Sequence, residues 1–575
     1  MANLIGRRQA ILAALLVAAI LAVAVGRLAL FGWGPVAPDD ARYLNVGLSV
    51  LGGQGAVTPE GNPFLLRSPV YGVALALGGV VTGTDPLVAA RFVAAALMVV
   101  AFLAAVRLGW ILGGPIGATG TAVAILATPL LWRLLPTLRI DLVQGASVIG
   151  VILAMRRPTL PRAALAGAIF GLTILVKETA LLAAVLPFAW VGFVPPRRWL
   201  ALAVVFGVAA ALVAGWWWAF VWLKAGVVFP LNAIGVIEQR DVAGSLRPSR
   251  EGLLLVALLG AGALGLIPRL RTDPTARLLA LAVVAMIPPA IYATANGLST
   301  RNYAVLALLC CCAVGATTAD VVAWIRRRTA ASPRWTRWGA VAAGVVMACA
   351  LVLLAQKATG AAGGSTLPEQ VSSWLGSHAT AGQRVVMTFR LRELVTLELR
   401  NRVSVASLAA NRVRADDDPA SFVWMGLRDQ QLFGYSAAAW DRTLGQPGTG
   451  FLVLVEPHAL TPSELLPVLE SPRGVAAGFV AVTTLREGDD AAHLFTVEPA
   501  RVTVPASTLG LHLSPDAVRA WVELGGVPAL VAARPVIVGT ARSLDQLRAA
   551  LAGLACLAPA TANEAPGSMV LSTCP

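Results

Sequence analysis

The stretch WGPVAPDDARYLNVGLSVLGGQGAVTPEGNPFLLRSPVY, residues Trp33–Tyr71, follows the first long apolar run and is the first place where charge accumulates in this chain. Asp39 and Asp40 are adjacent there, directly before a segment, Ala41–Leu51, that we expect to be helical. A pair of carboxylates beside a membrane surface can bind a divalent cation, hold an acceptor hydroxyl or act as a base. The alternative is that the pair only caps the helix, because Asp is a preferred N-cap residue. If the helix begins at Ala41, we expect unequal roles: Asp40 caps the helix, and Asp39, which lies off the helix, is freer to reach the acceptor hydroxyl or a cation.

The composition is that of a polytopic membrane protein. Of the 575 residues, 57% are hydrophobic and 13% are charged, and the mean hydropathy is +0.75. A soluble globular protein does not need so much apolar sequence. Much of the net charge of +15 comes from Arg clusters between apolar runs, which are typical of cytoplasmic loops. The clusters are not interleaved with aromatic residues, so we expect no nucleic acid as a partner.

Eleven apolar runs are candidate membrane spans, although several are shorter than the roughly 20 residues that a bilayer requires. A further apolar segment, Pro69–Gly83, decides the topology. If it is an interfacial or re-entrant helix, the Arg clusters all lie on one face, and the positive-inside rule makes that face cytoplasmic. The first run is then an uncleaved signal anchor. The eleven runs are Ile11–Phe31, Pro86–Leu112, Gly117–Leu131, Asp141–Met155, Ala163–Lys177, Thr179–Val194, Trp199–Leu223, Gly252–Ile267, Ala276–Ala295, Tyr303–Ile325 and Trp338–Gln356.

This topology is testable with reporter fusions. We expect fusions at Thr84, Pro158 and Lys357 to lie outside, inside and outside the cell, because the Arg clusters would otherwise be divided between the two faces. The measurement is the activity of a reporter that works on one side of the membrane only. A cytoplasmic Thr84 would contradict the re-entrant helix.

In this topology, the outer face, opposite the Arg clusters, carries nearly all acidic residues of the membrane half. Charged groups at a membrane edge are costly and tend to mark function. We therefore interpret this outer-face set as a site. Its members are Asp39, Asp40, Arg67, Arg139, Asp141, Lys177, Glu178, Glu238, Arg240, Asp241 and Arg301.

The composition changes after about Ala358. Residues 382–405 have the pattern strand, helix, strand, and Phe451–Val455 and Leu494–Val497 are further strand candidates. We predict a membrane domain, 1–357, formed by an all-α bundle of about eleven spans, and a C-terminal extracytoplasmic α/β domain, 358–575. The histidines are scattered and are interpreted as structural or surface residues; they are His378, His458, His493 and His512.

Cys556 and Cys574 are the only cysteines of the predicted outer domain. An oxidising compartment and an even count allow a disulfide between them, and the sequence leaves the bonded and free forms open. If the two are bonded, a membrane-impermeant alkylating agent labels neither thiol in native protein before reduction. Free reaction of both thiols would show that the pair is not bonded.

The order of features in the membrane half resembles a known family. An acidic pair follows the first helix, then a helix ends in Arg-x-Asp, and then come GLTILVKETALLAAVLP (171–187) and RNYAVLALL (301–309). This order resembles the GT-C superfamily of integral-membrane glycosyltransferases, in particular bacterial members similar to protein O-mannosyltransferases and to the lipid A aminoarabinose transferase. The resemblance covers about residues 10–325.

The resemblance implies a polyprenyl-phosphate-linked sugar as the donor, used on the outer face of the cell membrane. It implies that Asp39 or Asp40 is the first-loop acid and Asp141 the second-loop acid. It also implies that Lys177 binds the donor phosphate, together with the pair Arg301 and Tyr303. The aminoarabinose branch has Glu-Lys before Pro-Pro where this chain has Arg67-Ser68-Pro69, which argues against that branch's substrate. If a divalent metal takes part, Asp39 and Asp141 are its candidate ligands.

The chemistry of sugar transfer suits these residue types. A carboxylate near the acceptor hydroxyl acts as acid or base, and Arg67, Lys177 or Arg301 stabilises the departing phosphate. The Trp-rich run Trp216–Trp222 either lines a groove for the prenyl tail or forms an interfacial aromatic belt. The alternative functions are a transporter or flippase with charges along a substrate path, and an assembly protein acting through its outer domain. The sugar, and whether the acceptor is a protein, a lipid or a polysaccharide, stay open.

Overall fold

The structure of this protein is a computed structural model. It describes residues 15–16, 18–29, 33, 36, 38–57, 64, 67–135, 137–225, 250–295, 303–328, 366–387, 389–399, 402–407, 444–456, 466, 469–488, 490–502, 510–511, 536–538, 557–559 and 568–573. Outside these ranges lie the predicted span Trp338–Gln356 and Glu238, Arg240, Asp241, Arg301, His458, His512, Cys556 and Cys574.

The described residues form two compact units. The helical unit holds those of 15–33, 74–217 and 250–328, and the sheet unit holds those of 36–73, 218–225 and 366–573. Of the described residues in the segment Trp33–Tyr71, all but Trp33 therefore belong to the sheet unit. The predicted domain boundary between 357 and 358 stays a prediction.

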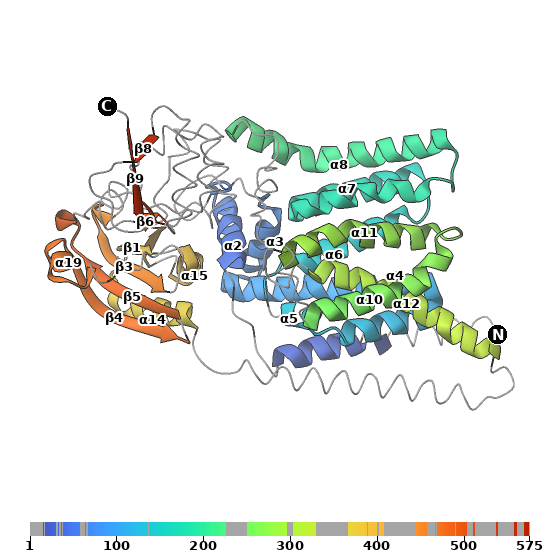
Figure 1. The fold of residues 1–575 in the computed structure, drawn as a ribbon, viewed down its shortest axis with the longest axis horizontal. Coiled ribbons are helices and arrows are strands. Elements are labelled where there is room, and N and C mark those ends of the chain that lie inside the picture. The colour runs from blue at the N-terminus through green and yellow to red at the C-terminus, as the bar shows by residue number, and fades with distance from the viewer. Residues whose placement is uncertain are drawn as a thin grey trace. The chain divides into compact units, whose positions relative to one another are not determined.

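The helical unit consists of apolar helices (Figure 1). Five helices in the described ranges are long and apolar enough to cross a bilayer, and other apolar helices are shorter, so the expected number of eleven spans stays a prediction. Leu212 and Leu264 are 77% and 71% exposed, as expected for side chains that face lipid. Its helices include α4 (Pro86–Leu126), α5 (Pro129–Leu134), α6 (Asp141–Met155), α7 (Leu160–Val176), the 3₁₀ helix η1 (Glu178–Trp190), α8 (Pro196–Ala225, of which 218–225 belong to the sheet unit), α10 (Arg250–Leu266), α11 (Pro274–Ala295) and α12 (Ala304–Arg328).

Helix α4 contains a chain reversal, which confirms the predicted break between two consecutive apolar runs. Gly113 and Gly114 have non-helical backbone angles, and Gly114 has a φ of 61°. In a straight helix Gly109 and Thr121 would lie about 18 Å apart along the axis. Here a Cβ added to Gly109 would overlap the Thr121 side chain. Glycine is needed at the reversal, since only it adopts this conformation without strain.

Helix α12 packs closely against α4 and α10 through small residues. A Cβ at Gly315 would overlap Thr121 and Gly117 of α4, and a Cβ at Gly265 of α10 would overlap Thr317 of α12. Such close approach is typical of membrane helices, whose association depends on van der Waals packing.

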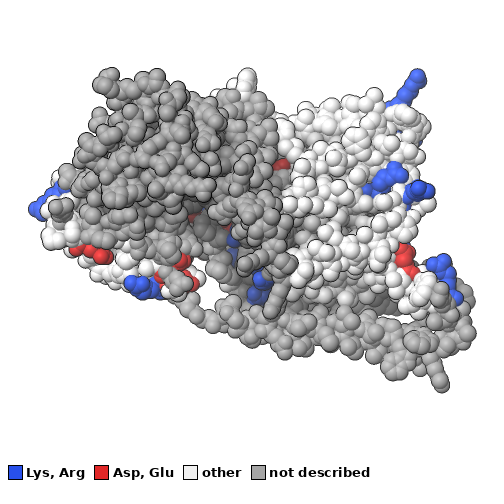
Figure 2. Space-filling view, viewed as in Figure 1, with Lys and Arg blue, Asp and Glu red and all other residues white. Residues whose placement is uncertain are grey.

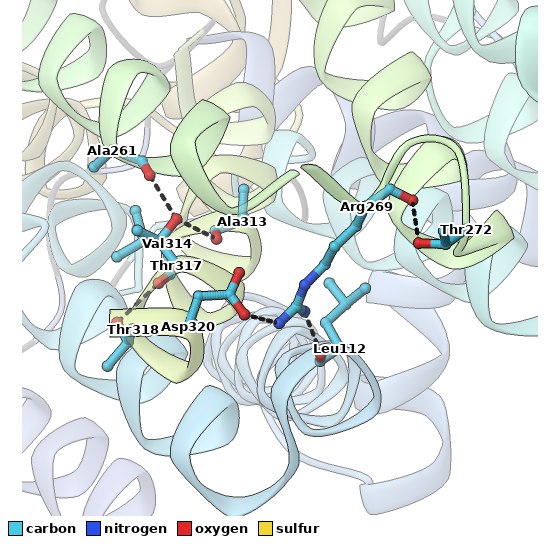
Figure 3. A network of polar contacts seen from close by, with 9 residues as sticks. All are labelled: Leu112, Ala261, Arg269, Thr272, Ala313, Val314, Thr317, Thr318 and Asp320. Carbon is cyan, nitrogen blue, oxygen red and sulfur yellow. Dashed lines mark hydrogen bonds and ion pairs between the residues drawn. The ribbon is translucent and has the colours of Figure 1, made fainter. Parts of the chain in front are cut away.

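A polar network joins the ends of the same three helices (Figure 3). Arg269, which follows α10, donates to Asp320 of α12 at 2.5 Å and to the carbonyl of Leu112 in α4. Thr317 donates to the carbonyl of Ala261 at 2.6 Å. These bonds hold α10, α12 and the first arm of α4 in register.

Charge is distributed unevenly over the helical unit. The face visible in Figure 2 is largely uncharged, and Lys and Arg side chains gather near the start of α8 and the end of α12. Arg197, Arg198 and Arg327, from the predicted cytoplasmic clusters, are exposed there. Their shared end agrees with the one-sided distribution that the sequence predicts, and a cytoplasmic location for this end stays a prediction.

The sheet unit contains a five-stranded sheet in the order β2-β1-β3-β5-β4. Strands β1 (Arg384–Met387), β2 (Ser404–Ser407) and β3 (Thr449–Glu456) are parallel, and β5 (Asp490–Val497) and β4 (Phe479–Glu487) are antiparallel to their neighbours. Helix α15 (Phe389–Leu399) connects β1 to β2, and α14 (Leu367–His378) precedes β1.

The two faces of this sheet follow the alternation of a strand. Val385 and Val453 pack with buried side chains of α14 and α15 on one face, whereas Val386 and Leu452 lie on the other face together with Phe479 and Phe495. The predicted strand–helix–strand of residues 382–405 and the strands at Phe451–Val455 and Leu494–Val497 are confirmed. Strand β4 was not predicted. A second, four-stranded sheet has the order β6-β7-β9-β8, from Gly510–Leu511, Val536–Val538, Ser568–Thr573 and Leu557–Pro559.

Candidate active site

The helical unit holds one buried ion pair between two residues that the sequence singled out. Lys177 Nζ donates to Asp141 Oδ1 at 2.6 Å. The two side chains are only 10% and 2% exposed, so both charges have been removed from water. Charges are buried at this cost when they are paired, and in membrane proteins they tend to mark a functional site.

Local backbone structure brings these side chains together. Asp141 is the first residue of α6, whereas Lys177 ends α7 in an extended conformation (φ −153°, ψ 125°). The chain leaves the helix at that point and enters η1. Gln144, one turn after Asp141 and also buried, donates to Thr179 at 3.0 Å. The start of α6 is therefore tied twice to the α7–η1 junction.

Asp141 precedes an apolar run, where an acidic residue could also serve as a simple helix cap, but it does not cap α6. The N-cap residue of α6 is Ile140, and no side chain caps this end. The Asp141 carboxylate binds Lys177 instead. Its negative charge in the first turn also interacts favourably with the helix dipole.

Tyr303 lies at the same end of the helical unit. It is buried and directly precedes α12. Gly145, one turn into α6, lies against Val305 and Leu308 in the first turns of α12. The starts of α6 and α12 are therefore neighbours, and Asp141 and Tyr303 are at neighbouring helix ends. Arg301, predicted to act with Tyr303, lies outside the described residues.

The acidic pair lies in helix α2 (Pro38–Leu51) of the sheet unit, and this corrects the expected helix start at Ala41. Asp39 and Asp40 are the second and third helical residues, because Pro38 begins the helix, where proline is favoured. Asp40 is therefore not the N-cap, and Asp39 is not off the helix. Every residue from Asp40 to Gly47 is buried, and Asp40 is only 1% exposed.

Arg67 is held against α2. Its Nη1 donates to the Tyr43 hydroxyl, and its guanidinium lies 5.6 Å from the centroid of the Tyr43 ring. Tyr71, at the start of α3 (Val70–Thr82), contacts the Tyr43 ring edge to face, with centroids 6.1 Å apart. A Cβ at Gly47 would overlap the backbone of Gly72, so α2 and the start of α3 are in close contact. The predicted phosphate ligand Arg67 and the acidic helix thus form one packed element.

Four further buried polar residues of the sheet unit were not predicted from the sequence. They are Arg42 and Asn45 of α2 and Arg392 and Glu393 of α15, all at most 6% exposed. The separation of about 350 residues between the two helices explains why a sequence pattern does not reveal the contact. The only local signal is the presence of Arg and Glu in a segment that also carries the apolar residues of a buried helix.

Within the described ranges, no group of three His, Cys, Asp or Glu side chains could hold a metal ion. The carboxylate of Asp141 is neutralised by Lys177 at 2.6 Å, and an ammonium group competes with a cation for the same oxygens. Metal binding by Asp39 and Asp141 stays a prediction.

The similarity of this chain to known proteins is seen when structures are compared. No protein-family profile and no curated protein sequence matches it. ArnT from Cupriavidus metallidurans, an aminoarabinose transferase, has 15% identity and a TM-score of 0.55, over 85% of this chain and 99% of that chain, in its apo state. The complex of the same protein with undecaprenyl phosphate gives the same values. AglB from Archaeoglobus fulgidus, an oligosaccharyltransferase bound to an inhibitory peptide and a dolichol-phosphate, has 11% identity and a TM-score of 0.44, over 86% and 76% of the two chains.

The resemblance to GT-C membrane glycosyltransferases is thus confirmed at the level of the fold, since ArnT aligns over nearly its whole length. The match includes more of this chain than residues 10–325, to which the sequence resemblance was confined.

Proposed function

We propose that this chain is a multi-pass glycosyltransferase of the cell membrane that moves a sugar from a polyprenyl phosphate to an acceptor hydroxyl on the outer face. The observation that carries the proposal is the buried Asp141–Lys177 pair in a chain with the fold of ArnT. The ArnT complex with undecaprenyl phosphate supports the choice of a prenyl phosphate as the carrier.

In the proposed reaction, the acceptor oxygen forms a bond to the anomeric carbon while the bond from that carbon to the phosphate oxygen breaks. The phosphate leaves on its prenyl carrier and is already charged, so it needs cations rather than a proton. Lys177, Arg67, Arg301 and Tyr303 are the proposed phosphate ligands. The acceptor hydroxyl loses its proton to a carboxylate, for which Asp39 or Asp40 is proposed.

The geometry distinguishes the roles proposed for the acids. Asp141 is bound to Lys177 and is well suited to orient the ammonium group toward a phosphate. Because Oδ1 of Asp141 already accepts from the ammonium group, we do not assign the role of base to this carboxylate. Asp40 is buried at the third position of α2, and we propose it as the base.

The first test is to purify the protein with native lipids and identify bound polyprenyl phosphate by mass spectrometry. We expect wild-type protein to retain the lipid and Lys177→Met to retain about tenfold less. Asp320→Asn is the control, because Asp320 forms a half-exposed ion pair with Arg269 in the same unit. The second test is to add a sugar-loaded carrier and follow release of the free carrier. Lipid binding without sugar transfer to any acceptor would favour the flippase alternative, and absence of bound lipid would contradict the proposal.

A further inference from the structure

A buried polar network joins α2 to α15 within the sheet unit. The Oε1 of Glu393 accepts from Arg42 Nε at 3.2 Å and from Arg392 Nη2 at 2.5 Å. The Oε2 of Glu393 accepts from Asn45 Nδ2 at 3.3 Å, and Asn45 also donates to the Glu393 backbone carbonyl at 3.0 Å. One carboxylate thus receives three donors, two of them from the acidic helix.

The burial of this network indicates that it does more than hold two helices together. The Glu393 side chain is 0% exposed, and the side chains of Arg392 and Arg42 are 1% and 7% exposed. Apolar side chains of similar volume would join two helices at a smaller desolvation cost. What a directional network supplies in addition is a defined rotation and register, because its hydrogen bonds tolerate little displacement.

The rotation of α2 matters because this helix carries groups of the proposed site. Arg42 and Asn45 are three residues apart and share one helix face, which the network directs toward α15. Asp40 lies half a turn before Arg42, and Tyr43 lies between the two network residues. Because Tyr43 accepts the hydrogen bond of Arg67, the position of α2 also sets the position of that guanidinium.

We propose that Glu393 is a positioning residue, whose carboxylate sets the rotation of α2 and so places Asp40 and, through Tyr43, Arg67. The inference rests on the proposed function for its catalytic consequence. It assigns a task to the C-terminal part of the chain: α15 supplies the buried charge that orders the acidic helix.

Two isosteric substitutions and their combination test this. Glu393→Gln removes the charge that compensates both guanidiniums, and Asn45→Asp sets two carboxylates against each other. In Asn45→Asp/Glu393→Gln the carboxylate and the amide exchange helices, so the network regains its composition. The matched control is Glu498→Gln, which makes the same chemical change in an exposed ion pair of the same unit, with Arg501 at 3.3 Å.

Two readouts are needed. The first is hydrogen exchange of the backbone amides of 38–51. We expect each single variant to raise it at least about tenfold, and the double variant and the control to remain near wild type. The second is binding of undecaprenyl phosphate in detergent micelles, which we expect to weaken about tenfold in each single variant and to recover in the double variant.

The outcomes separate the two proposals. If wild-type protein does not bind undecaprenyl phosphate, the proposed function fails, and the exchange of 38–51 still decides the inference. Wild-type exchange and wild-type binding in a folded Glu393→Gln would overturn the inference. If the isosteric variants do not fold, Asn45→Ala decides it, because it removes two hydrogen bonds and leaves both ion pairs intact. Unchanged exchange in that variant would also overturn the inference.

Discussion

Replacing Lys177 by Met is expected to reduce sugar transfer by about 10²–10³-fold, the range found when one preorganised donor to a developing anion is removed. It should also destabilise the protein by roughly 3–5 kcal/mol, because it leaves the buried Asp141 carboxylate without its cation. Asp141→Asn should have a similar cost in stability, since Lys177 then keeps its charge without a counter-ion. The measurements are the rate of release of free carrier lipid and the melting temperature in detergent.

The double variant Asp141→Leu/Lys177→Met separates the two effects. Replacing a buried ion pair by apolar side chains is often neutral for stability. We therefore expect the melting temperature to return close to wild type while sugar transfer stays low. The control Asp320→Asn removes an ion pair whose carboxylate is 45% exposed, so it should cost at most about 1 kcal/mol and leave transfer unchanged. Recovery of transfer in the double variant would show that the pair acts on stability alone.

Replacing Asp40 by Asn is expected to reduce sugar transfer about 10²–10⁴-fold, the usual effect of losing a general base. Asn has nearly the shape of Asp, so the helix and its packing should persist. We choose Asp40 because it is only 1% exposed and because α2 begins at Pro38, so that Asp40 lies within the first turn and not before the helix. The measurement is the rate of transfer at saturating donor, which separates a defect in proton transfer from a defect in binding.

Asp39→Asn is the matched comparison, since it makes the same change one residue earlier on the same helix. We expect its loss of transfer to be at least tenfold smaller than that of Asp40→Asn. A large loss in Asp39→Asn with near-normal transfer in Asp40→Asn would assign the base to Asp39. Small and equal losses in both variants would remove this segment from the active site.

The helix that carries the acids shows where inference from sequence reached its limit. The sequence predicts a helix at Ala41–Leu51, and the structure has one at Pro38–Leu51. This three-residue difference in the helix start matters for the chemistry, because Asp40 becomes a buried carboxylate within the first turn and not the expected N-cap. The first residue of a helix is hard to predict from sequence, because Pro and Asp are both common in the first helical turn and just before it.

The sequence by itself determined the features that depend on local composition. Apolar runs predicted the helices of the helical unit, the gap between Pro86–Leu112 and Gly117–Leu131 predicted the break in α4, and short strand-like runs predicted β1, β2, β3 and β5. Asp141 and Lys177 were also selected from the sequence, because charges at the edges of apolar helices are rare and costly. Each of these signals lies within a few residues of the structure that it specifies.

Only the tertiary structure decided which charges meet. It pairs Asp141 with Lys177, 36 residues away, and it pairs Arg42 with Glu393, 351 residues away. The pattern around Glu393 does not distinguish a buried carboxylate from an exposed one. Burial depends on what packs over a residue, and the partner that compensates a buried charge comes from a distant part of the chain.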